Sequence, residues 1–127
     1  MTEDFYLLWS PATEQAKRTY ADMQVATELG ACAIALLFVK EQLGKVVIER
    51  SAKGTGFDYW IGEEAEDGLP FQGMARLEVS GILAGTQAQI QGRIAQKKKQ
   101  MDPTDASAPG FVAVVEFGTP IAHLEGK

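Results

Sequence analysis

The chain has 127 residues, of which 46% are hydrophobic and 23% are charged, and its formal net charge is −5. This length fits a single domain over residues 1–127, the composition excludes a disordered chain, and the lone cysteine, Cys32, excludes an intramolecular disulfide. Because the net charge is negative, general electrostatic attraction to nucleic acid is not expected.

The N-terminal third is expected to be mostly helical. Acids stand near its start where a secretory signal would be basic, so we expect a cytoplasmic location. Ser10-Pro11 predicts a helix start, and residues 12–43 are strong helix formers that end at Gly44. Gly30 either kinks this long helix or divides it in two. The apolar run at residues 30–39 is shorter than the roughly 20 residues of a membrane span, so we expect a buried helix and no membrane association.

After Gly44 the spacing of apolar residues changes from helical to alternating. Residues 45–51 and 57–61 are expected to pair as a hairpin across a turn with two glycines. Residues 71–82 predict a third strand, in which alternation separates two sets of side chains. One face carries Ala75, Leu77 and Val79, and the other carries Met74, Arg76, Glu78, Ser80 and Ile82.

The C-terminal third predicts a second helix and one further strand. The helix begins at Gly85-Thr86 and runs to about Met101. Residues 111–117 resemble a strand buried on both faces, and residues 118–127 are expected to form a short tail. The predicted fold class is therefore α/β (α+β), with a central mixed sheet flanked by the long N-terminal helix and the second helix. The predicted core comprises Leu36, Leu37, Phe38, Ile90, Ile94, Val112 and Val114.

Two acids stand on neighbouring predicted strands. Asp58 lies in an otherwise apolar and aromatic segment, residues 57–61, where an unpaired charge is costly to bury. Glu78 lies in the next strand along the chain. Carboxylates that converge from adjacent strands are the minimum ligand set for Mg²⁺ or Mn²⁺, whose other ligands are water and substrate phosphate.

The order of elements and two short segments resemble a known family. The segments are Gly-Phe-Asp58-Tyr-Trp-Ile and Arg-Leu-Glu78-Val-Ser80-Gly, and the resemblance covers residues 11–117. They resemble the core of the PD-(D/E)XK nuclease superfamily, also called restriction-endonuclease-like. The resemblance implies an αβββαβ core in which Asp58 and Glu78 bind a divalent metal ion. In that family a lysine two residues after the glutamate orients the attacking water, and Ser80 stands in its place here.

The resemblance also indicates where further groups would come from. Some members take an acid from the first helix, which makes Glu28 a further candidate metal ligand. Others supply the missing lysine or a glutamine from the next helix, where Gln87 and Gln91 are nearest to the end of the third strand, and Lys97 and Lys98 lie farther along. The candidate catalytic residues are therefore Asp58, Glu78, Ser80 and Gln91.

The same charged residues have alternative roles within the fold. Asp58 and Glu78 would instead pair with Arg50, Lys53 or Arg76 across the sheet. The bases of the second helix would contact nucleic acid if the chain binds it, or would form a solvated helix end favoured by the helix dipole. These bases are Arg93, Lys97, Lys98 and Lys99.

Two functions follow from these patterns. Ser80 carries no positive charge with which to stabilise a developing oxyanion. Together with the small size and the acidity, this favours a catalytically weak or inactive nuclease-fold protein that binds another protein, as an immunity protein, an inhibitor or a complex subunit. The alternative is an endonuclease that cleaves DNA or RNA phosphodiesters with Mg²⁺ or Mn²⁺ at Asp58 and Glu78.

Overall fold

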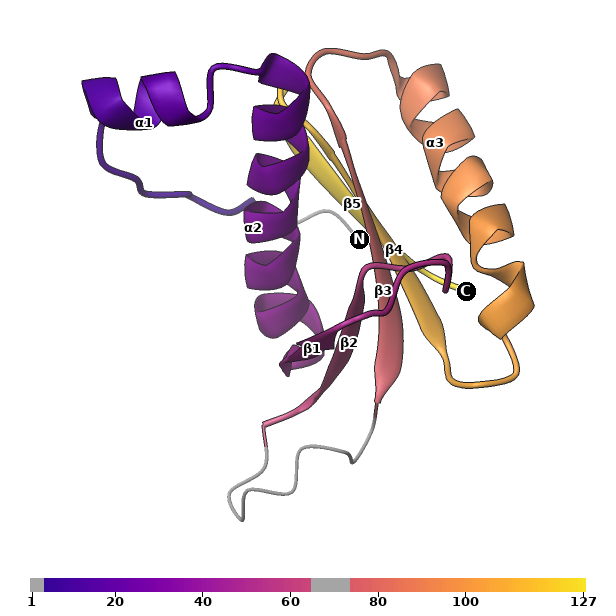
Figure 1. Cartoon of the computed structure of the whole chain (residues 1–127). Helices are drawn as coiled ribbons and strands as arrows, with labels where there is room; N and C mark the ends of the chain where they lie inside the picture. Colours follow the sequence, from indigo (N-terminus) through magenta and orange to yellow (C-terminus); the bar gives the residue numbers. More distant parts are fainter. Residues whose placement is uncertain (1–3, 65–73) are drawn as a thin grey trace.

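The computed structural model describes residues 4–64 and 74–127, which form a five-stranded mixed sheet with helices on both faces (Figure 1). The helices are α1 (Glu14–Thr19), α2 (Met23–Leu43) and α3 (Gln87–Gln100), and a 3-10 turn follows at Asp102–Thr104. The strands are β1 (Lys45–Arg50), β2 (Tyr59–Glu63), β3 (Ala75–Ile82), β4 (Gly110–Glu116) and β5 (Ile121–Gly126).

The strands lie in the sheet in chain order, from β1 to β5. β1, β2 and β3 form an antiparallel meander, so the predicted hairpin of the first two strands is confirmed. β4 pairs parallel to β3, with α3 as the connection between them, and β5 pairs antiparallel to β4. The first three residues of the predicted third strand, 71–73, lie outside the described residues. The described fold is therefore α+β.

α2 covers one face of the sheet and α3 covers the other (Figure 1), and β3 supplies buried side chains to both. Ala75, Leu77 and Val79 belong to the apolar core under α2. The alternate residues from Arg76 to Ser80 are polar and equally buried, with partners on the α3 side. The alternation predicted for this strand is confirmed.

The N-terminal helical region is two helices, and the break lies at residues 20–22 instead of at Gly30, where the sequence left a kink or a division open. α1 begins after Thr13, whose hydroxyl accepts from a first-turn amide at 3.0 Å, and Ser10 lies before it. α2 begins after Asp22, whose carboxylate accepts from two first-turn amides at 2.9 and 3.1 Å. A side chain that caps a new helix competes with continuation of the previous one. Gly30 lies inside α2 and does not divide it.

The C-terminal residues form a strand, which corrects the prediction of a tail over residues 118–127. Glu116, buried at the end of β4, accepts from the amides of Gly118 and Thr119 and so holds the turn that reverses the chain. Ala122 and Leu124 of β5 then pack against the core on the α2 face. Two apolar residues in alternation are a weak pattern, which is why the strand was missed.

α3 begins close to its predicted start. The Gln89 amide donates to the Thr86 hydroxyl at 3.2 Å, and the Gln89 side chain accepts from the Thr86 amide at 2.7 Å, which is a capping box. The apolar stripe of the helix packs on β4, where Ile90, Ile94, Val112 and Val114 form a core with Phe57 and Met101.

The core is divided between the two faces of the sheet, whereas the sequence predicted a single core. α2 contacts the sheet through Ala31, Ala35 and Val39, each at most 1% exposed. Leu37, predicted to be buried, is 52% exposed. The middle of α2 is apolar on every side, so periodicity could not indicate which side faces the sheet.

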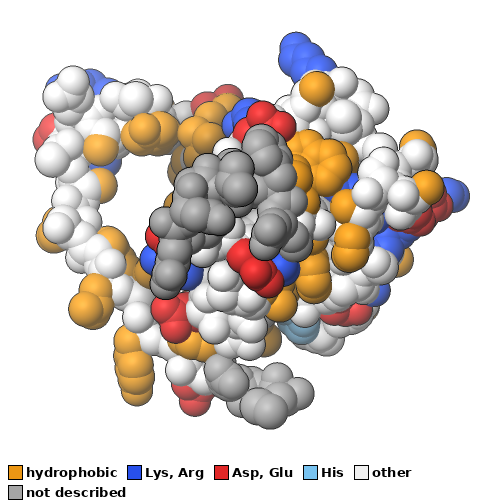
Figure 2. Space-filling model, turned by 90° about the horizontal axis from the view of Figure 1, so that it is seen from below, with side chains coloured by type: hydrophobic (Ala, Val, Ile, Leu, Met, Phe, Trp, Pro, Cys, Tyr) orange, Lys and Arg blue, Asp and Glu red, His pale blue; other side chains and the backbone are white. Residues whose placement is uncertain are grey.

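α2 is also long and apolar enough to cross a membrane, by length and composition alone, with 17% of the most apolar window buried in the protein. In this fold the helix packs against β3, β1 and β4. α1 and the chain next to it project from the rest of the molecule (Figure 2), and α1 contains no buried residue, whereas Phe5, farther upstream, packs against Phe38 of α2. The expected absence of membrane association stays a prediction.

Candidate active site

Asp58 stands directly before β2 and is bound to β3 through its backbone and its side chain. Its N–H donates to the Leu77 carbonyl at 2.9 Å, and its Oδ2 accepts from the Val79 N–H at 2.8 Å. Leu77 and Val79 flank Glu78 in the sequence. These bonds therefore hold the Asp58 carboxylate beside Glu78.

Glu78 lies in the middle of β3 with a side chain only 3% exposed. Its Oε1 lies 2.8 Å from Lys97 Nζ and accepts from Gln100 Nε2 at 3.3 Å. Both partners come from the last two turns of α3. A buried carboxylate needs such partners, because an unpaired charge at this depth would be strongly destabilising.

Asp58 and Glu78 line one surface pocket of about 470 Å³. The loop between β1 and β2, to which Asp58 belongs, supplies most of the lining, and Gln100 comes from the end of α3. The lining residues are Arg50, Ser51, Ala52, Lys53, Gly54, Gly56, Phe57, Asp58, Glu78 and Gln100. The lining thus includes two acidic and two basic residues, and the guanidinium of one of the bases, Arg50, lies over the Tyr59 ring.

Burial raises the pKa of Glu78 from an ordinary value of 4.5 to about 7. Desolvation of the carboxylate is the largest cause, the Lys97 ammonium opposes it, and the neighbouring Asp58 carboxylate adds to it. Glu78 therefore changes its charge close to neutral pH. A strongly shifted pKa in a pocket is a common property of functional carboxylates.

The approach of Lys97 to Glu78 follows from the lengths of the two elements. Glu78 stands four residues before Ile82, which is about 13 Å along a strand. α3 packs back along β3 and β4, and Lys97 stands ten residues after Gln87, which is about 15 Å along a helix. The end of α3 is therefore level with Glu78. Gln91, nearer to the start of α3, is not among the residues that line the pocket, and a role for it in the site stays a prediction.

Three other predicted site residues are not among those that line the pocket. Ser80 is buried and its hydroxyl accepts from Arg93 Nη1 at 2.7 Å. Gln91 is exposed on α3, and Glu28 is exposed on α2. Gln100, which the sequence did not suggest, does line the pocket, and its position one turn after Lys97 could have indicated it.

The bases predicted to contact nucleic acid mostly have partners within the chain. Arg93 donates to Ser80, Lys97 pairs with Glu78, and Lys98 pairs with Glu125 at 3.0 Å. Lys99 is exposed. The predicted pairing of Arg76 with the two site acids is also absent from the described residues, since Arg76 pairs with Asp105 at 3.1 Å.

Two carboxylates are a sufficient protein contribution for one kind of metal ion. Among residues 4–64 and 74–127, no group of three or more His, Cys, Asp or Glu side chains comes together. Two carboxylates, of which Glu78 already contacts Lys97, would suit only an ion that takes few protein ligands and completes its shell with water and phosphate, as Mg²⁺ does. They do not fit a structural zinc site, which needs four protein ligands.

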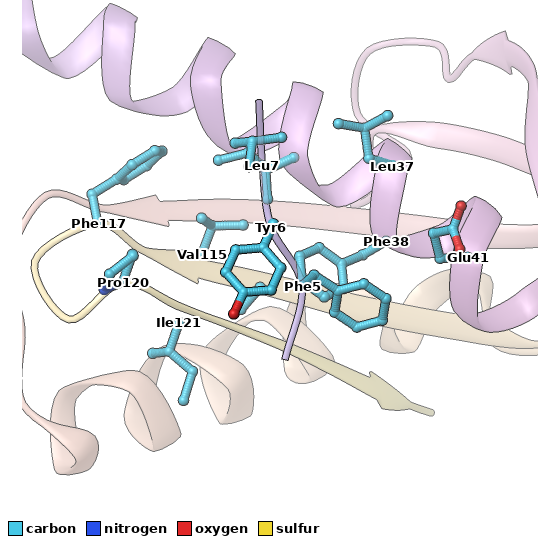
Figure 3. A pocket seen from close by; sticks show the side chains of 12 residues that line it. Phe5, Tyr6, Leu7, Leu37, Phe38, Glu41, Val115, Phe117, Pro120 and Ile121 are labelled. Carbon is cyan, nitrogen blue, oxygen red and sulfur yellow. The ribbon is translucent and has the colours of Figure 1, made fainter. Parts of the chain in front are cut away.

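A second pocket, of about 340 Å³, lies between the N-terminal segment, α2 and the start of β5 (Figure 3). In this view Pro120 and Ile121 lie on one side, Leu37 and Phe38 lie on the other, and Tyr6 lies between them. Its lining is almost entirely apolar, with Glu41 as the charged residue among the described residues that line it. Such a pocket suits binding rather than acid-base chemistry.

The comparisons with known proteins add no family to this picture. No protein-family model, no curated protein and no solved structure matches the chain.

Proposed function

We propose that the chain is a divalent-metal-dependent phosphodiesterase with a restriction-endonuclease-like core, acting on nucleic acid. The observation that carries the proposal is the position of Lys97, whose Nζ lies 2.8 Å from Glu78 Oε1 beside the Asp58 carboxylate. The sequence favoured an inactive protein because Ser80 lacks charge. Lys97 supplies a positive charge from α3, and this reverses the preference.

The topology supports the proposed core. A helix, an antiparallel meander of three strands, a crossover helix and a parallel fourth strand follow one another along the chain. α1 and β5 are additions at the two ends of this series. Glu78 lies inside the third strand, as the resemblance implies, whereas Asp58 directly precedes the second strand in place of the expected position inside it.

In this proposal Asp58 and Glu78 hold one Mg²⁺ or Mn²⁺ ion. Such an ion polarises a phosphoryl oxygen and makes a bound water more acidic. Lys97 contacts Glu78 but is not among the residues that line the pocket; it would orient Glu78 and bring an ammonium group towards the ion and its bound phosphate. Because the pKa of Glu78 is about 7, its ligating form predominates only at neutral and higher pH unless the ion itself lowers that pKa.

Substitution of Lys97 tests the proposal most directly. The purified chain is assayed with plasmid DNA, single-stranded DNA and RNA in Mg²⁺ and in Mn²⁺. We expect Lys97→Met to lower cleavage about 100- to 1,000-fold, the range seen when one electrostatic stabiliser of a transition state is removed. Lys99→Met is the matched control, because Lys99 lies in the same helical turn but is exposed. It should cleave as the wild type does.

Asp58→Asn and Glu78→Gln complete the test. Each should abolish cleavage and weaken Mn²⁺ binding in calorimetry, since each removes one carboxylate ligand. Wild-type protein that neither binds Mn²⁺ nor cleaves any of the three substrates would overturn the proposal. Equal activity in Lys97→Met and Lys99→Met would exclude the role given to Lys97.

The second candidate function is binding of another protein, as an immunity protein, an inhibitor or a complex subunit. The apolar pocket of Figure 3 favours it, together with exposed apolar residues around it such as Tyr6, which is 95% exposed, and Leu37. Contiguous apolar surface of this kind is typical of an interaction site. A partner protein of complementary apolar surface would cover Leu37 and the N-terminal segment.

A photo-crosslinking residue tests this second candidate in cells that produce the chain. Placed at Leu37, it should give one adduct of defined mass with another protein. Placed at Gln96, an exposed position on α3, it should give none. The same diffuse background from both positions would count against a protein partner at the apolar pocket. Fractionation of the same cells tests the predicted cytoplasmic location.

A further inference from the structure

The N-terminal arm, residues 4–22, is apolar in part of its sequence but is not buried in the fold. None of these residues is buried, although residues 5–9 are all large and apolar. Tyr6, Leu8 and Trp9 are 95%, 92% and 78% exposed. α1, the helix within the arm, projects from the rest of the molecule (Figure 2). Apolar surface exposed in this way indicates a partner that the single chain does not supply.

The arm contacts the rest of the chain near its beginning. The rings of Phe5 and Phe38 lie 5.0 Å apart, edge to face. Phe5, Tyr6 and Leu7 also line the apolar pocket, together with residues of α2 and β5 (Figure 3). α1, which follows, contains no buried residue. These contacts therefore hold the arm at one end and leave α1 without support from the sheet.

The break between α1 and α2 is opposed by the sequence around it and is held by a cap at Asp22. The Asp22 carboxylate accepts from two first-turn amides of α2 at 2.9 and 3.1 Å. No glycine or proline lies between Glu14 and Leu29, and α1 has only six residues, a length that is not stable as an isolated helix. A continuous helix from Glu14 to Leu43 would therefore replace the break at the cost of one cap.

A continuous helix would remove the arm from its own pocket. Glu14 and Phe38 would lie about 36 Å apart along such a helix, at 1.5 Å per residue. The nine residues from Phe5 to Glu14 span at most about 32 Å when fully extended, and they would also have to reverse direction at Glu14. Phe5 would therefore fall short of Phe38 in its own chain. Only the Phe5 of another chain could then take that position.

We propose that two copies of the chain exchange their arms, with residues 14–43 as one continuous helix in each copy. The contact between arm and pocket uses the same residues as in the closed chain, so the second copy needs no new complementarity, and a two-fold arrangement forms the contact twice. Leu8 and Trp9 then have the α2 side of the second copy to pack against, where Val25 and Leu29 are 46% and 49% exposed. The inference does not depend on phosphodiesterase activity, and it names a second copy as the partner at the apolar pocket.

Two neighbouring substitutions should change the association in opposite directions. Sedimentation equilibrium of the full chain should show a species of twice 13.8 kDa that dissociates on dilution. Asp22→Ala removes a cap that only the closed chain uses and should tighten association about 30-fold, which is about fivefold for each of two chains. Met23→Pro should weaken association more than about 100-fold, because proline is not tolerated inside a continuous helix.

The closed chain accepts Met23→Pro, which makes it the matched counterpart of Asp22→Ala. Met23 is the first residue of α2, a position where proline is favoured. Asp22 is already extended, with φ −75° and ψ 111°, as a residue before proline requires. Met23 is also 57% exposed, so little packing is lost. The circular dichroism spectrum of Met23→Pro should therefore show a folded chain.

A chemical crosslink distinguishes arm exchange from side-by-side association. Tyr6→Cys and Ile121→Cys, in a Cys32→Ser chain, place two thiols at the apolar pocket, and a bismaleimide joins them. Exchange gives a covalent dimer on a denaturing gel, whereas the closed chain gives an internally linked monomer. Tyr6→Cys with Gln96→Cys, an exposed position on α3, should give no covalent dimer.

Three results would overturn the inference. One is a wild type and an Asp22→Ala variant that both stay monomeric at the highest soluble concentration. Another is a dimer whose association neither Asp22→Ala nor Met23→Pro changes. The third is an internally linked monomer as the product of the crosslink between positions 6 and 121. None of these results bears on Mn²⁺ binding or on cleavage, so the proposed function would stand or fall separately.

Discussion

On the α2 side of the sheet, β3 contributes Ala75, Leu77 and Val79 to a core without a charged group, whereas on the α3 side every second residue from Arg76 to Ser80 is polar and buried. An apolar core is stabilised by any well-packed neighbour, but each polar group must find a particular partner. β3 is therefore constrained by close packing on its α2 face and by specific polar partners on its α3 face.

The three buried polar residues on the α3 side of β3 differ in whether partners inside the fold satisfy them. Arg76 donates to carbonyl groups and to Asp105 at the end of the sheet, and Ser80 accepts from Arg93. Both are satisfied inside the fold. Glu78 is the one of the three that lines the pocket, and its pKa is raised to about 7. A buried polar residue thus indicates a functional role when its surroundings shift its pKa towards neutral pH. It indicates a structural role when hydrogen bonds and ion pairs within the fold satisfy it.

The largest effect that would test this comparison is loss of packing on the α2 side. Leu77 is fully buried, so Leu77→Ala should lower the free energy of unfolding by roughly 2 to 5 kcal/mol through lost burial and a residual cavity. Leu37→Ala removes the same atoms from a half-exposed position and should cost less than about 0.5 kcal/mol. Urea denaturation measures both. Similar losses at the two positions would mean that the α2 core is misplaced.

A second, smaller effect belongs to Glu78 and depends on pH. Its pKa is about 7 in the folded chain and 4.5 ordinarily, so between these values the folded state holds a proton that the unfolded state has lost. Stability therefore falls as pH rises from 4.5 to 7, by at most about 3 kcal/mol for this shift. Denaturation of the wild type and Glu78→Gln at pH 5, 6, 7 and 8 in EDTA measures it.

Glu78→Gln should lack this decline, since glutamine does not titrate. The difference in unfolding free energy between the variant and the wild type should then change in favour of the variant from pH 5 to pH 8. If the unfolding free energies of the two proteins depend on pH in the same way, ionisation of Glu78 does not destabilise the fold. In that case its burial would not distinguish it from Arg76 and Ser80.

Much of the fold was predictable because its signals are local. The alternation of residues 75–82 assigned each β3 side chain to its face, and Thr86 indicated the start of α3. The break between α1 and α2 was not predictable in the same way, because Asp22 interrupts a run of helix formers without a glycine or proline. β5 was missed because its apolar pattern rests on Ala122 and Leu124 alone.

The candidate site was predictable as far as it depends on neighbouring strands. Asp58 and Glu78 come together because β2 and β3 are consecutive and antiparallel. Lys97 and Gln100 depend on how far α3 returns along the sheet, which is a property of packing. Lys97 was among the candidates on this helix, but the direction of α3 across the sheet, which brings Lys97 to Glu78, is a tertiary feature that no local pattern contains.

The smallest of the three effects concerns Arg76, the structural counterpart of Glu78 on the same face. Its guanidinium donates to the carbonyls of Ala108 and Met101 at 2.9 and 3.0 Å, and to Thr104 and Asp105. Arg76→Met keeps most of the side-chain volume but leaves buried acceptors unpaired, and should lower stability by about 1 to 3 kcal/mol. Asp105→Asn changes a half-exposed carboxylate that pairs with both Arg76 and Lys127, and it should cost less than Arg76→Met does. If Arg76 serves only the fold, Arg76→Met will still bind Mn²⁺ in calorimetry with wild-type affinity. A variant of wild-type stability that no longer binds Mn²⁺ would instead place Arg76 in the site and end the distinction drawn between it and Glu78.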